Sequence, residues 1–236
     1  MKFISYQERR NKTNILIRRY KVYNFLFFKI KKKVLPVFGE NNTIIIGGRE
    51  LTEDDKQLLD KAGKITIVGN NNVVELADIT NLNCNIWVQG NNNRISIGKC
   101  KSLTNIHVSM PQNWDNRELI INDFRYFQNV GFSVIGNNRK IHVGKDCMFS
   151  SGINVWTTDF HPIYDLETNK RVNEEQDIII GDHVWLGREI FISKGSIIPS
   201  GCVIGAKSFV NKAFTKENTI IAGIPAKVVK ENIRWE

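Results

Sequence analysis

The chain has no long apolar run, few cysteines and few histidines, and each shortage excludes a class of protein. Its 236 residues include four cysteines and four histidines. No uncharged apolar stretch approaches the roughly 18 residues that a membrane-spanning helix needs. The cysteines form no Cys-x-x-Cys pair and stand in no secretory context, so we expect reduced, buried thiols in a cytoplasmic protein. They are Cys84, Cys100, Cys147 and Cys202.

Positive charge is concentrated at the amino terminus. Residues 1–33 carry 11 Lys or Arg and one acid, whereas the remaining 203 residues carry 22 Lys or Arg and 23 acids. This stretch has too much charge in its middle for a signal peptide. We predict a basic amphipathic arm over residues 1–40. Two interpretations stay open: peripheral contact of residues 1–33 with the inner face of the cytoplasmic membrane, or packing on the fold or a neighbouring copy. Nothing else in the chain favours nucleic-acid binding.

A bulky apolar residue recurs at every sixth position between residues 180 and 210. A period of six fits neither a helix nor a flat strand. It fits a coil that turns a corner every six residues, with three hexads closing one triangular turn and the apolar side chains pointing inward. The inward residues are Ile180, Leu186, Ile192, Ile198, Ile204 and Val210. The positions four residues later are also expected inside: Val184, Ile190, Ser196, Cys202 and Ser208.

The same spacing extends upstream in a looser form. Val143, Phe149 and Val155 are six apart, and Ile97 and Leu103 continue the series. Gly-Asn phrases recur at residues 69–72, 90–93 and 136–138, which favours corners followed by short strands, with stacked asparagines forming a ladder. A β-sandwich is the alternative, but it predicts hairpin spacing. We therefore predict an all-β solenoid over residues 41–236, with a short helix inserted at about 52–62, where Thr52 and Asp55 suggest a capping box, and a carboxyl-terminal tail at about 215–236.

The hexad pattern breaks once, between Val155 and Ile180, which are 25 residues apart. Long loops on a rigid scaffold usually serve binding or catalysis. We therefore predict a catalytic loop at about 157–178. It contains His161, with Asp159 and Asp165 close in sequence.

Several phrases of the chain resemble those of the hexapeptide-repeat acyltransferases. These are Thr-Thr-Asp-Phe-His-Pro-Ile-Tyr-Asp ending at residue 165, Ile-Gly-Asp-His-Val-Trp-Leu-Gly ending at residue 187, Gly-Ala-Lys-Ser-Phe-Val ending at residue 210 and Ala-Gly-Ile-Pro-Ala-Lys ending at residue 227. Their order is most similar to that of the O-acetyltransferases of capsular polysaccharide and lipopolysaccharide, including those that act on polysialic acid. The resemblance is strong over about residues 130–236 and weak before them.

The resemblance implies a left-handed parallel β-helix, an exception to the right-handed crossover rule. It further implies a homotrimer with active sites between neighbouring copies, acetyl-coenzyme A as co-substrate and no metal. The segments that match coenzyme A contacts in the family point to Gly187, Ala206, Lys207, Ala222, Gly223, Ala226 and Lys227. Small residues there would let the pantetheine arm run along the coil, and Lys207, Lys212, Lys227 and Arg234 would meet phosphates as cations.

The chemistry requires a base, because a sugar hydroxyl is a poor nucleophile at neutral pH. His161 is the loop's histidine, and imidazole is largely neutral at that pH and able to accept a proton. Asp159, a backbone carbonyl or an acid from the neighbouring copy would orient the ring. Trp185 is the family-matched residue for the oxyanion, through its backbone N–H, with its ring beside the thioester. No Cys or Ser of the loop lies beside a matched base in a nucleophile arrangement, which favours direct transfer without an acyl-enzyme.

Three other functions remain open at this stage. The same machinery would acetylate an amino sugar, a small sugar or an antibiotic. A trimeric zinc carbonic anhydrase shares the fold, but His142, His161 and His183 lack its paired spacing. A solenoid without catalytic activity would leave His161 and Trp185 without a purpose. We therefore expect O-acetyl transfer from acetyl-coenzyme A to a bacterial surface glycan.

Overall fold

The computed structural model describes residues 36–52, 55, 63–111 and 114–236. The predicted arm falls almost wholly outside these residues, as does the body of the helix expected at about 52–62. Asp55 does accept a hydrogen bond from the Thr52 N–H at 3.0 Å, one of the two bonds of a capping box. Val37 and Phe38 already form a strand, so the first coil starts a few residues before the predicted boundary at residue 41. No helix long and apolar enough to cross a membrane occurs in the described part of the chain.

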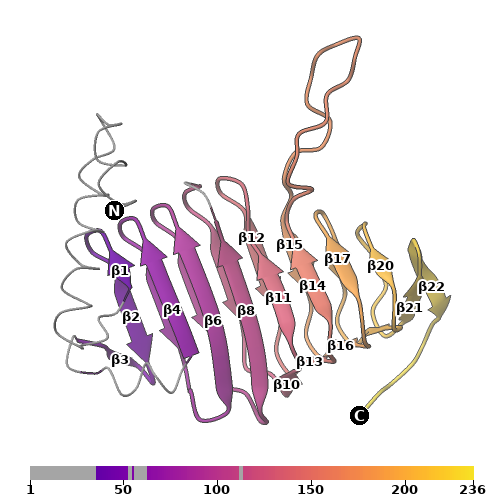
Figure 1. Cartoon of the computed structure of the whole chain (residues 1–236). Coiled ribbons are helices and arrows are strands. Elements are labelled where there is room, and N and C mark those ends of the chain that lie inside the picture. The colour runs from indigo at the N-terminus through magenta and orange to yellow at the C-terminus, as the bar shows by residue number, and fades with distance from the viewer. Residues whose placement is uncertain (1–35, 53–54, 56–62, 112–113) are drawn as a thin grey trace, which may run out of the picture. The chain divides into compact units, whose positions relative to one another are not determined.

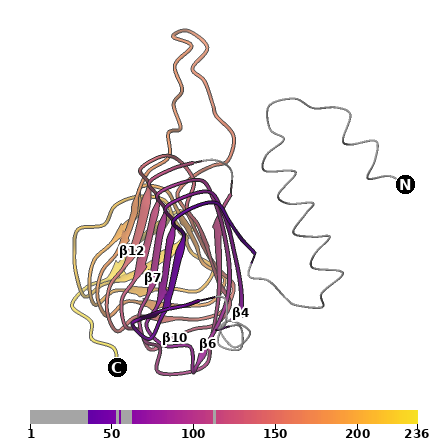
Figure 2. The ribbon, with the colours of Figure 1, turned by 90° about the vertical axis from the view of Figure 1, so that its left-hand side faces the viewer.

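Residues 36–236 wind into a parallel β-helix whose three faces we call sheets A, B and C (Figures 1 and 2). Sheet A contains β1 (Val37–Phe38), β4 (Gly63–Val68), β6 (Leu82–Gln89), β8 (Thr104–Met110), β11 (Val130–Ser133), β14 (Ile153–Trp156), β17 (Phe191–Ser193) and β20 (Phe209–Val210). Sheet B contains β3 (Arg49–Glu50), β2 (Thr43–Ile46), β5 (Val73–Leu76), β7 (Arg94–Ile97), β9 (Glu118–Ile121), β12 (Lys140–Val143), β15 (Ile178–Ile180) and β18 (Ile197–Ile198). Sheet C contains β10 (Tyr126–Phe127), β13 (Met148–Phe149), β16 (Trp185–Leu186), β19 (Val203–Ile204), β21 (Ile220–Gly223) and β22 (Ala226–Lys230).

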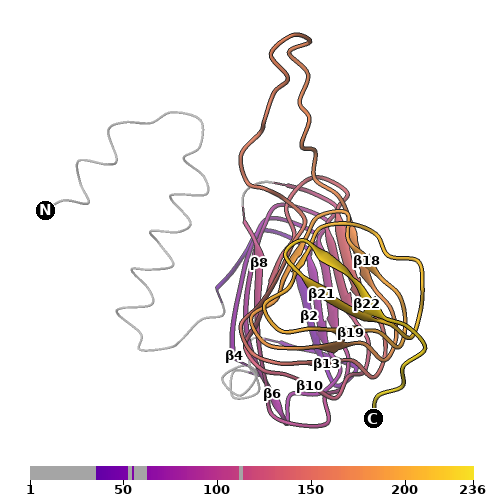
Figure 3. The same ribbon diagram turned by 90° about the vertical axis from the view of Figure 1, so that its right-hand side faces the viewer.

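All strand pairs are parallel except those that β3 and β22 make at the two ends. The chain passes from sheet A to B to C and back to A, and the helix is left-handed, as the resemblance implied. Figure 3 shows the antiparallel hairpin of β21 and β22 at the carboxyl-terminal end of the coils. This hairpin terminates sheet C, which would otherwise present an open strand edge to solvent.

The carboxyl-terminal coils confirm the hexad prediction. Ile180 pairs with Ile198 and Leu186 with Ile204, so one turn takes 18 residues there. All six predicted inward residues are buried, and so are the five small or apolar residues that follow them by four. Cys147 and Cys202 are among the buried, free cysteines. The triangular core is therefore built as the sequence pattern indicates.

The amino-terminal coils are wider, and one prediction fails there. Ile97 pairs with Ile121, 24 residues on, so these coils do not follow strict hexads. Leu103 was expected inside but is 71% exposed. Thr104 is buried instead, where its hydroxyl donates to the Ser102 carbonyl and accepts from the Phe127 N–H. The extra residues per turn shift the inward position by one, which the six-residue spacing could not reveal.

The predicted asparagine ladder is confirmed and runs along the corner between sheets A and B. In its interior column Asn72 donates to Asn42 at 3.0 Å, and Asn93 donates to Asn72 at 2.8 Å. Asn71 and Asn92 adopt positive φ, and they bond to each other in an exposed column. Asparagine tolerates this left-handed conformation, which explains why it recurs at each corner.

Arg117 ends the interior column and is almost fully buried. Its Nε donates to Asn93 Oδ1 at 2.9 Å. Its other four N–H groups donate to the backbone carbonyls of Gln89, Met110, Pro111 and Val134. All five donors of the guanidinium are thus satisfied without a carboxylate. Burial lowers the pKa of Arg117 to about 10, although nearby Asp115 opposes this shift, so the group stays a cation at neutral pH.

Candidate active site

The predicted catalytic loop leaves the coils after β14 and returns at β15, at the corner between sheets A and B. Val155 pairs with Ile192, 37 residues on, whereas an uninterrupted turn takes 18, so the loop adds 19 residues. It projects away from the coils as a long, narrow excursion (Figure 1). The strands on both sides keep their parallel pairing, so the insertion leaves the scaffold in register.

His161 lies on this loop with its backbone fixed and its ring exposed. Its N–H donates to the Asp159 carbonyl at 2.8 Å, and its carbonyl accepts from Asn173 Nδ2 at 2.8 Å. Phe160, just before it, has a φ of 66°, a conformation that is strained for an aromatic residue. The Thr158 hydroxyl accepts from the Phe160 N–H at 2.9 Å and holds this turn. In the described part of the chain, the imidazole has no hydrogen-bond partner.

Asp159 does not contact the His161 imidazole in this chain. Its Oδ2 lies 2.7 Å from Lys194 Nζ and accepts from Asn173 Nδ2 at 3.1 Å. Partial burial acts to raise the pKa of Asp159, but the bonds from Lys194 and Asn173 outweigh it and keep that pKa below its usual value. The carboxylate is therefore ionised at neutral pH and engaged with the loop base. Of the three predicted orienting groups, this structure leaves a backbone carbonyl or a neighbouring copy's acid.

The loop carries an unusual number of exposed apolar side chains. They are Phe160, Ile163, Tyr164, Leu166 and Val172. Leu166, at the tip, is 100% exposed. A contiguous set of exposed apolar residues on a projecting loop is typical of a protein contact surface.

Trp185 lies on β16 in sheet C, whereas the loop leaves the corner between sheets A and B, so one chain does not bring Trp185 to His161. Its backbone N–H donates to the Cys202 carbonyl at 3.0 Å within the sheet. The prediction that this N–H stabilises an oxyanion is therefore wrong, because a sheet hydrogen bond already uses the donor. Its ring is 37% exposed and lies 6.0 Å from the Trp235 ring, centroid to centroid. Only the ring remains available to a substrate.

Small residues stack at the corner between sheets C and A, where coenzyme A contacts were predicted. We call Gly187, Gly205, Ala206 and Ala222 the small-residue ledge. A Cβ on Gly187 would lie 2.9 Å from the Ala206 nitrogen, and one on Gly205 would lie 2.8 Å from the Ala222 Cβ. Larger side chains would therefore disrupt this stacking. The backbone here runs close to the surface without side chains to cover it.

The other predicted coenzyme A residues divide into two groups. Lys207, Gly223, Ala226 and Lys227 adjoin the ledge, in the same corner or in the β21–β22 hairpin. Lys212 follows β20 at the opposite edge of sheet A, where its Nζ lies 5.3 Å from the Phe214 ring centroid. Arg234 is in the tail and pairs with Glu236. The structure thus gathers seven of the nine predicted residues and leaves Lys212 and Arg234 elsewhere.

Sequence reasoning missed three residues that shape the loop. Asn173 is buried and bonds to both sides of the His161 turn. Arg171 forms an ion pair with Glu175 across the loop base. Lys194 comes from the corner after β17, where the Ser193-Lys194 phrase departs from the family pattern. That departure was the one signal in the sequence.

A cluster around Asp146 fixes the carboxyl-terminal tail beside Trp185. Asp146 accepts hydrogen bonds from Arg125 at 3.0 and 3.1 Å and from Lys101 at 3.1 Å, and it lies 2.9 Å from His183 Nδ1. The His183 ring stacks on Trp235 with centroids 4.0 Å apart, and Trp235 Nε1 donates to the His183 carbonyl. The hydrogen bond from Arg125, followed by those from His183 and Lys101, holds the pKa of Asp146 far below its usual range, against a smaller effect of burial.

Replacing Asp146 by asparagine should therefore lower the melting temperature at pH 7. Because the folded-state pKa of Asp146 is depressed, its contribution is present above the unfolded value of about 3.9 and is lost as pH falls further. The difference in melting temperature between wild type and Asp146→Asn should thus shrink between pH 7 and pH 3. Glu217→Gln, at an exposed position, is the control. A difference independent of pH would reject the role of the charge.

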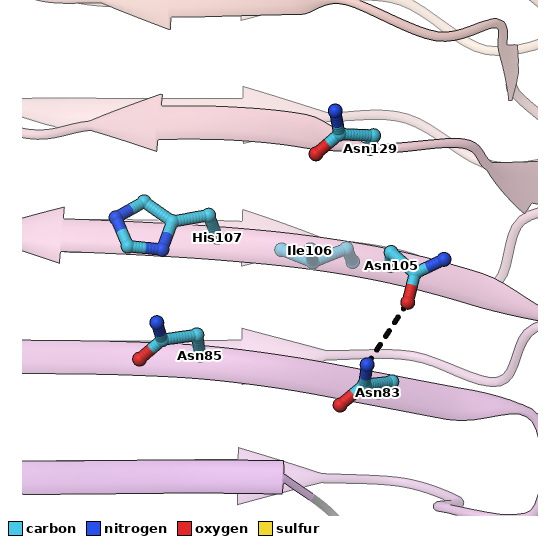
Figure 4. Close-up of a pocket in the computed structure, with 6 residues that line it drawn as sticks. All are labelled: Asn83, Asn85, Asn105, Ile106, His107 and Asn129. Atoms are coloured by element: carbon cyan, nitrogen blue, oxygen red, sulfur yellow. Dashed lines mark hydrogen bonds between the residues drawn. The ribbon is translucent and has the colours of Figure 1, made fainter.

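The outer face of sheet A carries a shallow hollow of about 340 Å³ in the amino-terminal coils (Figure 4). It is lined by Asn83, Asn85, Asn105, Ile106, His107 and Asn129. Asn83 donates to Asn105 at 3.0 Å across neighbouring strands. Further along the same face, Trp156 and Phe191 make an edge contact at 4.9 Å, and Phe191 lies 5.7 Å from Phe209. The face of sheet A is thus polar toward one end and aromatic toward the other.

Comparisons with known proteins extend the similarity beyond the carboxyl-terminal motifs. No protein-family model matches the chain. The polysialic acid O-acetyltransferase of Neisseria meningitidis is 39% identical over 198 residues, which cover 84% of this chain and 86% of that protein. The solved structure of the polysialic acid O-acetyltransferase OatWY matches with a TM-score of 0.55 and 34% identity, covering 85% of this chain and 91% of that one. That of the polySia-specific acetyltransferase NeuO matches with a TM-score of 0.53 and 26% identity, over 84% and 86% of the two chains.

Proposed function

Because the chain belongs to the hexapeptide-repeat O-acetyltransferases, we propose that it moves an acetyl group from acetyl-coenzyme A to a hydroxyl of a bacterial surface glycan, with His161 as the general base. The observation that carries the proposal is the identity over 198 residues with a polysialic acid O-acetyltransferase. The acceptor class follows from that relative, since a polysaccharide is what its name says it acetylates.

We propose that the active unit is a homotrimer. The loop leaves one edge of sheet A, and the small-residue ledge lies at the other edge, so they face away from each other in one chain. If three copies form a ring with sheet A turned toward the axis, each loop meets the ledge of its neighbour. The aromatic residues Trp156, Phe191 and Phe209 on sheet A and the exposed apolar residues of the loop support this arrangement.

In the proposed mechanism His161 takes the proton of the acceptor hydroxyl as its oxygen attacks the thioester carbonyl. The tetrahedral intermediate then collapses, the acetyl group stays on the sugar oxygen, and the coenzyme A thiolate leaves and is protonated. The small-residue ledge of the neighbouring copy gives the pantetheine arm a path along the backbone. Lys207 and Lys227 lie near the ledge and would meet the phosphates as cations. The Trp185 ring, in place of its N–H, would cover the thioester.

The acceptor can be identified directly. We would incubate the full chain with acetyl-coenzyme A and a panel of polysialic acid, other capsular glycans, lipopolysaccharide sugars, amino sugars and small sugars, and record mass increases by mass spectrometry. Ester-linked acetyl groups on a polymeric glycan would support the proposal. Acetylation confined to amines or to small sugars would replace it with the corresponding alternative, and no acetylation of any acceptor would reject it.

Replacing Ala206 by tryptophan should raise the KM for acetyl-coenzyme A at least about tenfold, because an indole would block the path along the ledge, and about 1.4 kcal/mol of lost binding is enough for that change. Ala206 is exposed, so the fold should tolerate the substitution. Thr215→Trp, also exposed on the terminal coil but away from the ledge, is the control. An unchanged KM in a folded Ala206→Trp protein would place the donor elsewhere.

A further inference from the structure

The base of the catalytic loop contains a chain of polar contacts that ends at His161. It consists of Lys194, Asp159 and Asn173, and we call it the loop-base relay. Lys194 belongs to the rigid coil after β17, whereas Asp159 and Asn173 belong to opposite sides of the loop. The relay therefore connects the scaffold to the segment that carries the imidazole.

Asn173 is the member that contacts His161. Its side chain is buried and uses its hydrogen-bonding groups on both sides of one turn. Nδ2 donates to the His161 carbonyl at 2.8 Å, and Oδ1 accepts from the Ile163 N–H at 2.7 Å. A carbonyl can only accept and an N–H can only donate, so both contacts require the same orientation of the amide. Pro162, between them, has no N–H of its own to offer.

Asp159 secures that orientation. It accepts the second hydrogen of Asn173 Nδ2 at 3.1 Å, and its own backbone carbonyl accepts from the His161 N–H. Both backbone polar groups of His161 are therefore held by Asp159 or Asn173. Rotation of the Asn173 amide would place Oδ1 against the carboxylate and the His161 carbonyl, which are both acceptors.

Lys194 makes Asp159 a fixed point. Its side chain is only 14% exposed, its Nζ is buried, and the Asp159 carboxylate lies 2.7 Å away. A buried ammonium is costly unless it is paired. The ion pair thus keeps the carboxylate ionised and in place.

We propose that Asn173, Asp159 and Lys194 are positioning residues that set the place of the His161 imidazole through its backbone. This inference rests on the proposed function of His161. It changes the role expected of Asp159, which acts on the main chain of His161 through Asn173 and not on the ring. None of the three needs to touch the substrate.

The test compares Asn173→Asp with Asn169→Asp, which makes the same change at the loop tip. An ionised carboxylate facing the His161 carbonyl and Asp159 should lower kcat about tenfold or more at pH 8 while the KM for acetyl-coenzyme A stays within about twofold, since a displacement near 1 Å is enough for such a loss. As pH falls, the introduced carboxyl gains a proton and can donate again. The ratio of variant to wild-type kcat should therefore rise between pH 8 and pH 5.5.

Lys194→Met should lower kcat by about three- to tenfold, and the exposed control Lys99→Met should not. The acceptor in these assays is the best glycan of the panel described above. A kcat within twofold of wild type for both relay variants, a kcat ratio that does not change with pH, or a loss confined to the KM for acetyl-coenzyme A, would overturn the proposal.

Hydrogen exchange separates this inference from the proposed function, because it needs no acceptor. In Asn173→Asp and Lys194→Met the amides of His161 and Ile163 should exchange at least about tenfold faster than in wild type, while coil amides keep their protection. Unchanged exchange at both amides would overturn the relay even in an active enzyme. If wild type acetylates nothing, the proposed function fails, yet this measurement still decides whether the relay holds the loop.

Discussion

Replacing His161 by alanine should lower kcat about a hundredfold or more, while the KM for acetyl-coenzyme A stays close to that of wild type. General-base catalysis by a positioned side chain contributes roughly 10²–10⁴-fold. His161 is exposed, and its ring makes no hydrogen bond to the described residues, so its removal should leave the fold intact. The measurement is steady-state kinetics with the glycan that the panel identifies, together with melting temperatures. A fall of only a few-fold would reject the role as base.

A mixing experiment adds a test of the site between copies. His161→Ala lacks the base, and Ala206→Trp blocks the ledge. In a ring each site takes its loop from one copy and its ledge from the next, so about a quarter of the sites in a random mixed trimer are intact. Refolding the two variants together should therefore restore about a quarter of wild-type activity at low acetyl-coenzyme A. No recovery, in trimers shown to be mixed, would place both residues in one chain's site.

Replacing Arg117 by methionine should destabilise the protein by on the order of 3 kcal/mol or more. Methionine fills much of the same volume but donates nothing, so five acceptors that Arg117 now satisfies would lose their partner. Buried carbonyls without donors are costly. For a chain of this length the melting temperature should fall by about 6–12 °C.

The control for Arg117 is Arg94→Met, on the preceding coil. Arg94 is exposed and pairs with Glu75 at 3.1 Å. An exposed ion pair contributes at most about 1 kcal/mol. If Arg117→Met and Arg94→Met lower stability equally, the interior hydrogen bonds of Arg117 do not contribute as described. Thermal and denaturant unfolding of both variants decide this.

The sequence predicted the coils wherever one side chain alone decides inside from outside. From residue 180 to residue 210 the apolar residues fall every six positions, and each is buried. In the wider coils the number of residues per turn varies, so Leu103 was placed inside although Thr104 occupies that position. The first Gly-Glu-Asn-Asn corner, residues 39–42, also escaped notice, because Glu40 interrupts the run of asparagines that marks the later corners.

The candidate site was predictable in its residues and less so in its geometry. The break in the hexads located the loop, and His161 stood out within it. The contacts of Asp159 could not be predicted, because they depend on Lys194 from a corner more than thirty residues later and on Asn173 from the returning side of the loop. Hydrogen bonding of the Trp185 N–H depends on the coil that stacks upon it, since Cys202 supplies the acceptor.

The interior column of asparagines carries a risk that Arg117 removes. Asn42, Asn72 and Asn93 offer the same amide to the same corner, so a nascent strand shifted by one whole turn would still find a matching neighbour. A guanidinium misplaced in that way would have to leave the four carbonyls that surround it in the correct arrangement. Arg117 thus gives one turn of an otherwise repetitive stack an address, and the growing solenoid can count from it.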